Sequence, residues 1–174
     1  MSEKATRILF SLAVFCCILF SSCKEDEECR RERYVRLSTV FYTVETNTST
    51  GLESIVKLTL SDSLSVWGMG VDSLLYFNAP KQNSIELPLN KLSDSSEFVF
   101  TFKDTLNVSV SDTISIYYEN REGFLSFECG CLNTFTIDSL RTKTTRHYID
   151  SIAINHKEVN TENVENIKIY HNSK

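Results

Sequence analysis

Residues 98–118, FVFTFKDTLNVSVSDTISIYY, decide the fold of this 174-residue chain. Apolar side chains recur there at every second position in two series, Phe98, Phe100 and Phe102 followed by Ile114, Ile116 and Tyr118. A period of two is typical of β-strands that bury one face, and the aromatic and β-branched content suits a pleated surface. The segment therefore predicts β-strands.

The same alternation continues on both sides of this segment. Further runs lie at 35–41, 56–60, 125–127, 135–137, 152–154 and 167–169. Short polar segments separate the runs, and Asn120–Gly123 is the strongest hairpin signal among them. About eight or nine strands without intervening helices predict an all-β domain over residues 34–174. We expect a single antiparallel β-sandwich of immunoglobulin-like or Greek-key type, with a partly open β-barrel as the alternative.

Residues 1–22 have the features of a secretory signal. Positively charged side chains precede an apolar segment at 8–20, which is shorter than the roughly 20 residues that span a bilayer, and small residues precede Cys23. The pattern resembles the signal peptide of bacterial lipoproteins, although Phe20 stands where that signal prefers leucine. The resemblance implies that residues 1–22 are removed and that Cys23 is acylated, so that lipid holds the protein on a membrane.

Residues 23–33 form an acidic tether. Cys23 is followed at once by a run of charged residues, Lys24, Glu25, Asp26, Glu27 and Glu28. Such runs are typical of solvated, self-repelling linkers. The residues directly after Cys23 also resemble the surface-export signal of Bacteroidota lipoproteins. This resemblance implies a place on the outer membrane facing the outside of the cell, and the periplasmic face is the alternative.

The cysteines predict one disulfide. An exported protein meets an oxidising compartment, and Cys29, Cys129 and Cys131 are the thiols left after removal of the signal and acylation of Cys23. In an extended strand Cys129 and Cys131 lie about 6.6 Å apart, farther than the distance that a bridge spans. Cys29–Cys129 is therefore our first pairing and Cys29–Cys131 the second. The histidines show no zinc-ligand spacing, so we expect no metal.

Composition and motifs bound the function. The net charge of −5, without a basic stripe that carries aromatic residues, argues against nucleic acid as a partner. No Gly-x-Ser-x-Gly, phosphate-binding glycine loop or His-Glu-x-x-His occurs, so no catalytic residue or cofactor is expected. Trp67-Gly68-Met69-Gly70 is a possible point of ligand contact at Trp67, but a strand end with a core tryptophan is favoured.

The tripeptide Asp-Ser/Thr-aliphatic recurs along the chain, for instance at Asp62-Ser63-Leu64 and Asp138-Ser139-Leu140. Aspartate and serine favour turns through local side-chain to backbone hydrogen bonds, which accounts for most copies. The tripeptide also resembles the acceptor of protein O-glycosylation in Bacteroidota. Ser63 and Ser139 are the candidate sites that this resemblance implies.

The C-terminal half carries a wider resemblance. Tyr148–Asn155, Val159 and Glu165–Tyr170, together with Cys129-Gly130, resemble an uncharacterised family of Bacteroidota cell-envelope lipoproteins. The resemblance implies an envelope location and an all-β fold, and no reaction.

Three classes of function follow. We expect a non-catalytic accessory module that binds another envelope protein through an exposed strand edge or apolar patch. The alternative is a glycan or small-molecule binder with a concave pocket that uses Trp67, Tyr117 or Tyr118. The third is an enzyme whose site joins His147 or His156 to a carboxylate of perturbed pKa.

Overall fold

The computed structural model describes residues 35–70, 74–127 and 129–171. The predictions for Cys23, residues 24–28 and Cys29 lie outside these residues. Within the described ranges the chain forms twelve strands and no helix. The strands are β1 (Leu37–Thr46), β2 (Glu53–Lys57), β3 (Ser63–Gly68), β4 (Leu74–Ala79), β5 (Ser84–Leu87), β6 (Ser95–Lys103), β7 (Ser109–Ser126), β8 (Gly130–Ile137), β9 (Lys143–Thr144), β10 (Ser151–Ile154), β11 (Glu158–Val159) and β12 (Ile167–Tyr170).

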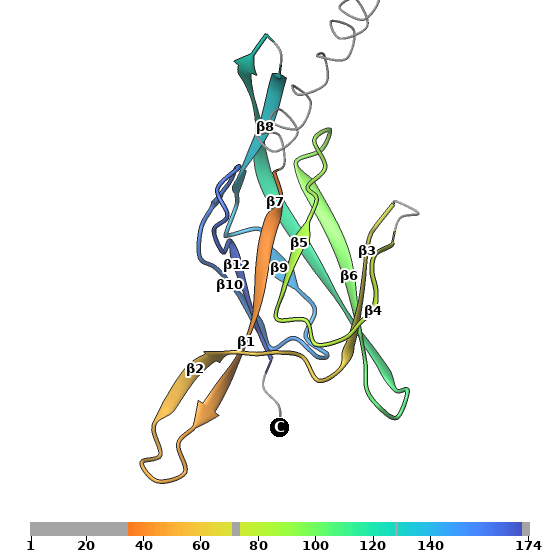
Figure 1. The fold of residues 1–174 in the computed structure, drawn as a ribbon, viewed down its shortest axis with the longest axis vertical. Coiled ribbons are helices and arrows are strands. Elements are labelled where there is room, and N and C mark those ends of the chain that lie inside the picture. Colours follow the sequence, from red (N-terminus) through yellow and green to blue (C-terminus); the bar gives the residue numbers. More distant parts are fainter. Residues whose placement is uncertain (1–34, 71–73, 128, 172–174) are drawn as a thin grey trace, which may run out of the picture.

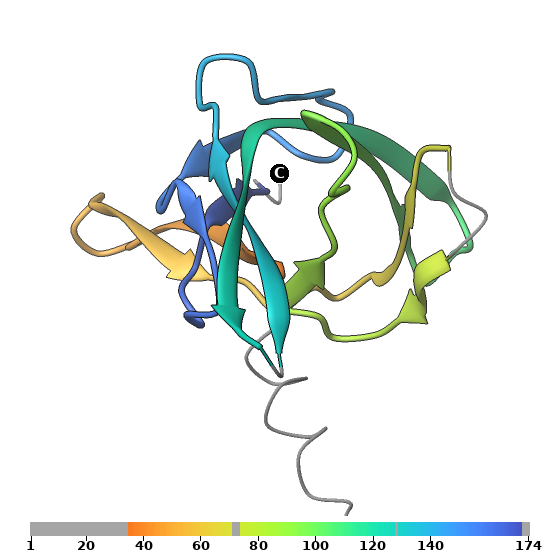
Figure 2. The same cartoon turned by 90° about the horizontal axis from the view of Figure 1, so that it is seen from above.

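Two sheets share these strands. The smaller sheet has the order β10-β12-β1-β2, with β5 also paired to β1. The larger sheet has the order β11-β8-β7-β6-β3-β4, with β9 also paired to β7, and it curls around the core (Figures 1 and 2). The predicted all-β class is confirmed, and the two sheets are consistent with the predicted sandwich. The pairing is not antiparallel throughout, because β1 and β12 run parallel, with Thr39 opposite Ile167.

The core contains the residues that the alternating pattern selects. Phe98, Phe100 and Phe102 of β6 are buried, and β7 adds Ile114 and Ile116 from the same sheet. The smaller sheet closes the core with the buried residues Leu37, Phe41, Ile167 and Ile169. Each large apolar side chain that is fully buried stabilises the fold by roughly 1.5–3 kcal/mol.

One turn was wrongly predicted. Asn120–Gly123 lies inside β7, where Asn120 is opposite Phe135 and Gly123 is opposite Leu132 of β8. The chain reverses only after Ser126, and Gly130 enters β8 with a φ of +71°. Asn120 is held in the β7–β8 pairing by a cross-strand hydrogen bond of 3.0 Å from the amide of Asn133. Tertiary pairing thus overrides the local turn preference.

The number of strands also exceeds the eight or nine expected. Strands β9 and β11 have two residues each, too few to show a period. Strand β4 lies at a sheet edge and pairs with β3 through register shifts, which break its alternation. No helix in the described part of the chain is long and apolar enough to cross a membrane.

Candidate functional site

A cavity of about 830 Å³ opens beside the predicted Trp67-Gly68-Met69-Gly70 site. It is lined by the end of β3, by Leu75 of β4, by the segment 88–93 and by the first half of β6. The Met69 N–H donates to the carbonyl of Glu97 at 2.8 Å, which fixes the end of β3 against β6. Most of the wall is aliphatic or polar, and Phe98 is its one aromatic residue.

Trp67 itself does not line this cavity. It is half-buried in β3, opposite Val99 of β6 and Leu74 of β4. Its neighbours Gly68 and Met69 do reach the cavity wall. Trp67 therefore lies in the sheet next to the cavity, in a place that suits a packing role.

A second cavity of about 690 Å³ lies on the other side of the segment 91–93. Tyr118 is its aromatic wall residue, and the Tyr118 hydroxyl donates to the carbonyl of Asn90 at 2.9 Å and bonds the Ser96 hydroxyl at 2.7 Å. Burial raises the pKa of Tyr118. Because its hydroxyl already has two partners, Tyr118 anchors the segment that separates the two cavities. Tyr117 is covered instead by the Arg141 guanidinium, 4.2 Å above its ring.

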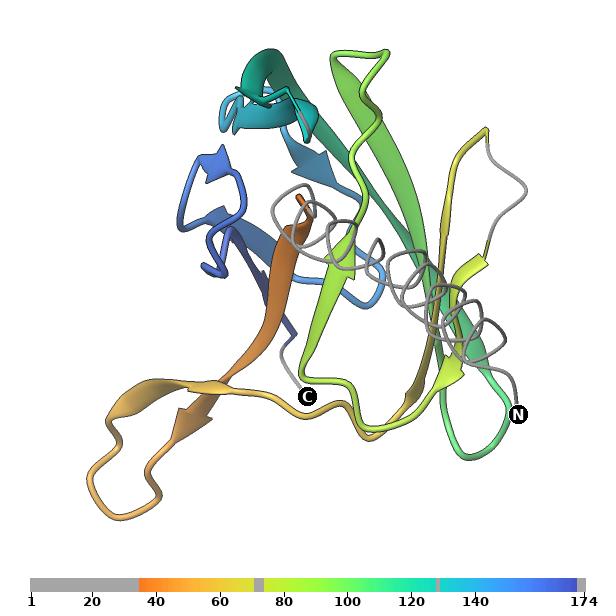
Figure 3. The same ribbon diagram turned by 45° about the horizontal axis from the view of Figure 1, so that its top comes forward.

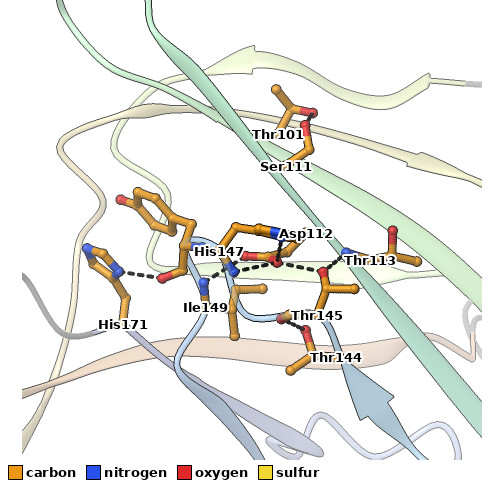
Figure 4. Close-up of polar contacts among 10 residues, drawn as sticks. Thr101, Ser111, Asp112, Thr113, Thr144, Thr145, His147, Ile149 and His171 are labelled. Atoms are coloured by element: carbon orange, nitrogen blue, oxygen red, sulfur yellow. Dashed lines mark hydrogen bonds and ion pairs between the residues drawn. The ribbon is translucent and has the colours of Figure 1, made fainter.

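Asp112 of β7 forms the densest polar cluster in the described residues (Figure 4). One carboxylate oxygen accepts from the Thr145 hydroxyl at 2.6 Å and from the backbone N–H and the ring Nδ1 of His147, each at 2.9 Å. The other oxygen accepts from the N–H groups of Tyr148 at 2.7 Å and Ile149 at 2.8 Å. Burial raises the pKa of Asp112, but these hydrogen bonds outweigh it and hold the pKa below its usual value.

An enzyme site was expected to join His147 or His156 to a carboxylate of perturbed pKa, and this cluster does join His147 to such a carboxylate. Asp112, however, is fully engaged by donors from the segment 145–149, and neither Asp112 nor His147 lines either cavity. His156 is exposed on the connection between β10 and β11. Asp112 therefore acts as a staple between β7 and the segment that leads into β10.

Stacked rings reinforce the staple. Tyr148 lies between Phe102 and His171, with ring centroids 3.9 Å apart on each side. The Tyr148 hydroxyl donates to Asp62 at 3.0 Å, and the His171 Nδ1 donates to the Tyr148 carbonyl at 2.8 Å. Burial and the charge of Asp62 raise the pKa of Tyr148 well above its usual value. The segment that bonds Asp112 is thus fixed through Tyr148 to both Phe102 in the core and His171.

The β1–β2 hairpin also carries exposed apolar side chains. It projects from the body as an arm (Figures 1 and 3), defined here as residues 45–57. Strand β2 lies at the edge of its sheet and is mostly exposed, with Ile55 60% exposed, and Leu52, just before β2, is 70% exposed. Asn47 closes the turn by accepting the N–H groups of Ser49 and Thr50. The arm offers a strand edge that no other described strand pairs with, next to apolar side chains.

Residues 63–171 match the model of a family of unknown function, DUF6452. The chain belongs to this family. No curated protein and no solved structure matches it. The DUF6452 match begins at β3, so that β1 and β2, with the arm, precede the matched region. The resemblance to an uncharacterised family is confirmed in this form, and the match itself names no ligand and no reaction.

The remaining predicted site residues of this DUF6452 protein are scattered. Ser139 is exposed in a turn, whereas Ser63 is half-buried and donates to the Lys103 carbonyl at 3.3 Å. Cys129 is buried, whereas Cys131 is exposed and free. No group of three His, Cys, Asp or Glu side chains placed to hold a metal occurs in the described residues.

Sequence reasoning missed the Asp112 cluster and the arm. Asp112 is in phase with the inward-facing Ile114 and Ile116, so the strand pattern itself signals a buried carboxylate that must find partners. The arm gave no comparable signal, because its apolar residues follow the same pattern as those of a buried hairpin.

Proposed function

We propose that this chain is a non-catalytic, lipid-anchored module of the Bacteroidota cell envelope that binds another envelope protein. The signal-like residues 1–22, Cys23 and the charged run 24–28 support an anchor on the outer membrane that faces the outside of the cell. A periplasm-facing anchor is the alternative. A bridge between Cys29 and Cys129 would fasten the tether to the domain.

The arm carries the proposal of a protein partner. Leu52 and Ile55 are both exposed on the arm, and the outer edge of β2 has no strand partner among the described residues, so a partner strand can pair with this edge while its side chains cover apolar residues of the arm. The charged side chains of Glu53 and Lys57 on the same strand discourage unselective pairing with other edges. This combination is typical of a specific docking edge.

The cavities support a glycan or small-molecule ligand less well. Sugar and aromatic ligands favour stacking on exposed rings, yet each cavity has a single aromatic residue in its wall. Tyr118 is committed to Ser96 and Asn90, and Trp67 lies outside the cavity wall. The arm therefore outweighs the cavities as a binding surface.

A crosslinked pull-down of the lipidated protein from its own envelope tests the proposal. The double variant Leu52→Glu/Ile55→Glu should recover on the order of tenfold less partner, since loss of two apolar anchors costs at least about 1.4 kcal/mol. Leu140→Glu is the matched control, because Leu140 is 96% exposed but lies outside the arm. Cys23→Ala should lose the partner through loss of the anchor. Equal recovery by the arm variant and the control would reject the arm as the docking edge.

A further inference from the structure

The outer part of the β7–β8 hairpin is a bare two-stranded ribbon. Strand β11 pairs with β8 as far as Phe135, opposite Asn120, so the last six residues of β7, roughly 20 Å, pair only with β8 among the described residues. Residues 121–125 of this stretch are all exposed. The ribbon projects from one end of the molecule, opposite the end that bears the arm (Figure 1). An isolated two-stranded ribbon is only marginally stable in water, so its tip calls for a contact outside the domain.

The tip of this ribbon is apolar. Phe127 is 95% exposed, Phe124 is 62% exposed and Leu125 is 39% exposed. The rings of Phe124 and Phe127 meet edge to face with centroids 5.4 Å apart, so that they present one continuous apolar surface. From Gly123 to Leu132 the sequence has one charged residue, Glu128, which lies outside the described residues.

The first strand, β1, begins near the same end of the molecule. Strand β1 begins at the end from which the ribbon projects and runs towards the arm (Figure 1). Fourteen residues lead from Cys23 to Leu37, so an anchor at Cys23 lies within about 50 Å of the start of β1. The predicted Cys29–Cys129 bridge would place the base of the tip closer still, with Cys129 within about 27 Å of the anchor.

We infer that the tip formed by Phe124, Leu125 and Phe127 inserts into the interface of the lipid bilayer that holds the anchor. This inference rests on the proposed function, since it takes the anchor at Cys23. Phenylalanine and leucine side chains partition into the boundary between headgroups and acyl chains. The acyl chains and the tip then form two contacts that orient the domain, and the arm faces away from the membrane, towards a partner.

Fluorescence in vesicles tests this orientation. Trp67→Phe removes the single tryptophan, and Phe127→Trp then introduces an indole at the tip of the full, lipidated protein. The protein is reconstituted into phosphatidylethanolamine/phosphatidylglycerol vesicles whose acyl chains carry bromine. We expect the indole emission to shift to the blue and to be quenched. Leu106→Trp in the same background is the control, because Leu106 is 81% exposed in the β6–β7 turn at the opposite end, and its emission should be unchanged.

The outcomes separate the two proposals. Intact mass and vesicle flotation first report whether Cys23 is acylated; an unacylated protein that does not float overturns the lipid anchor and the inference that rests on it. An acylated protein in which the tip indole is not quenched overturns the inference alone and leaves the tip for a protein contact. Equal quenching at both positions also overturns it. If Phe127→Trp fails to fold by circular dichroism, Phe124→Trp replaces it, with the same expected quenching.

Discussion

Asp112 on β7 accepts a hydrogen bond of 2.8 Å from the backbone N–H of Ile149, thirty-seven residues further along the chain. The bond joins the two sheets, because β7 belongs to the larger sheet and Ile149 lies two residues before β10 of the smaller one. The N–H groups of His147 and Tyr148 add to the same carboxylate. A single buried side chain thus accepts hydrogen bonds from three consecutive backbone N–H groups, which take no part in strand pairing.

Asp112→Asn should destabilise the domain strongly. The amide has one acceptor oxygen and places an N–H₂ group against backbone donors, so at least one buried donor loses its partner. We expect the free energy of unfolding to fall by about 2–4 kcal/mol, measured by urea denaturation. Asp94→Asn is the control: Asp94 is exposed and 3.9 Å from Arg141, so its loss should change little. A similar small effect of both variants would contradict the staple.

The same variant predicts a pH dependence. The folded-state pKa of Asp112 lies below the unfolded value, which is about 3.9. Its contribution is therefore present above that pH and is lost as the pH falls through the folded pKa. The difference in free energy of unfolding between the native protein and Asp112→Asn should therefore be constant from pH 5 to 7. It should narrow only below about pH 4, where Asp112 of the folded protein begins to take up a proton.

The sequence carried part of this picture. The alternation at 98–118 predicted the buried faces of β6 and β7, because burial on one face needs only a period of two. The Asp-Ser/Thr-aliphatic tripeptide shows what a local pattern leaves open. Asp104 and Asp138 accept backbone N–H groups two residues on, in turns, as the pattern favours. Asp112 has the same neighbours but lies mid-strand with its side chain inward, and its partners come from a distant segment that no local pattern names.

The arm and the ribbon were beyond prediction for another reason. Both are hairpins whose residues alternate or turn like those of the core, and only tertiary packing decides which end of a strand leaves the body. Asn120–Gly123 is the clearest case, since a strong turn signal became the middle of a strand once β8 paired along it.

Tyr42 predicts the behaviour of the fold in alkali. Its hydroxyl donates to Glu165, with contacts of 3.0 and 2.9 Å to the two carboxylate oxygens. Burial, followed by the bond to Glu165 and its charge, raises the pKa of Tyr42 to about 12. Because this pKa is higher in the folded than in the unfolded protein, the Tyr42 hydroxyl contributes fully to stability below the unfolded pKa of about 10. The contribution is lost as the pH rises to about 12.

The stability advantage of the native protein over Tyr42→Phe should therefore shrink between about pH 10 and 12 in urea denaturation. Tyr42→Phe leaves Glu165 and its ion pairs with Lys57 and Lys168 in place, so the contribution of these pairs to stability largely cancels in the difference. A gap that stays constant to pH 12 would argue against the raised pKa.

The cysteines predict a thiol count. Cys131 is exposed and free, and a Cys29–Cys129 bridge leaves it as the one thiol of the acylated, mature protein. Ellman's reagent under denaturing, non-reducing conditions should find one thiol in the native protein, none after Cys131→Ser and two after Cys129→Ser. Pairing of Cys29 with Cys131 would instead give no thiol after Cys129→Ser and two after Cys131→Ser.

The turn at Ser139 predicts a site of O-glycosylation. Ser139 is exposed beside Asp138, which accepts the N–H groups of Leu140 and Arg141 and so holds the turn open to solvent. Ser63 is half-buried with its hydroxyl engaged. Intact mass of the protein from its own envelope should show an added mass that Ser139→Ala removes and Ser63→Ala leaves. An unmodified native mass would rule out both sites.

The charged run after Cys23 predicts the face of the outer membrane. Replacement of residues 24–28 by alanine removes one positive and four negative charges and leaves Cys23 for acylation. If the run is an export signal, protease added to intact cells should cleave the native protein and spare the variant, which should be cleaved only after lysis. Both proteins should sediment with membranes, which shows that the anchor is intact. Equal cleavage in intact cells would mean that the run is a linker, because its charge would then have no part in sorting.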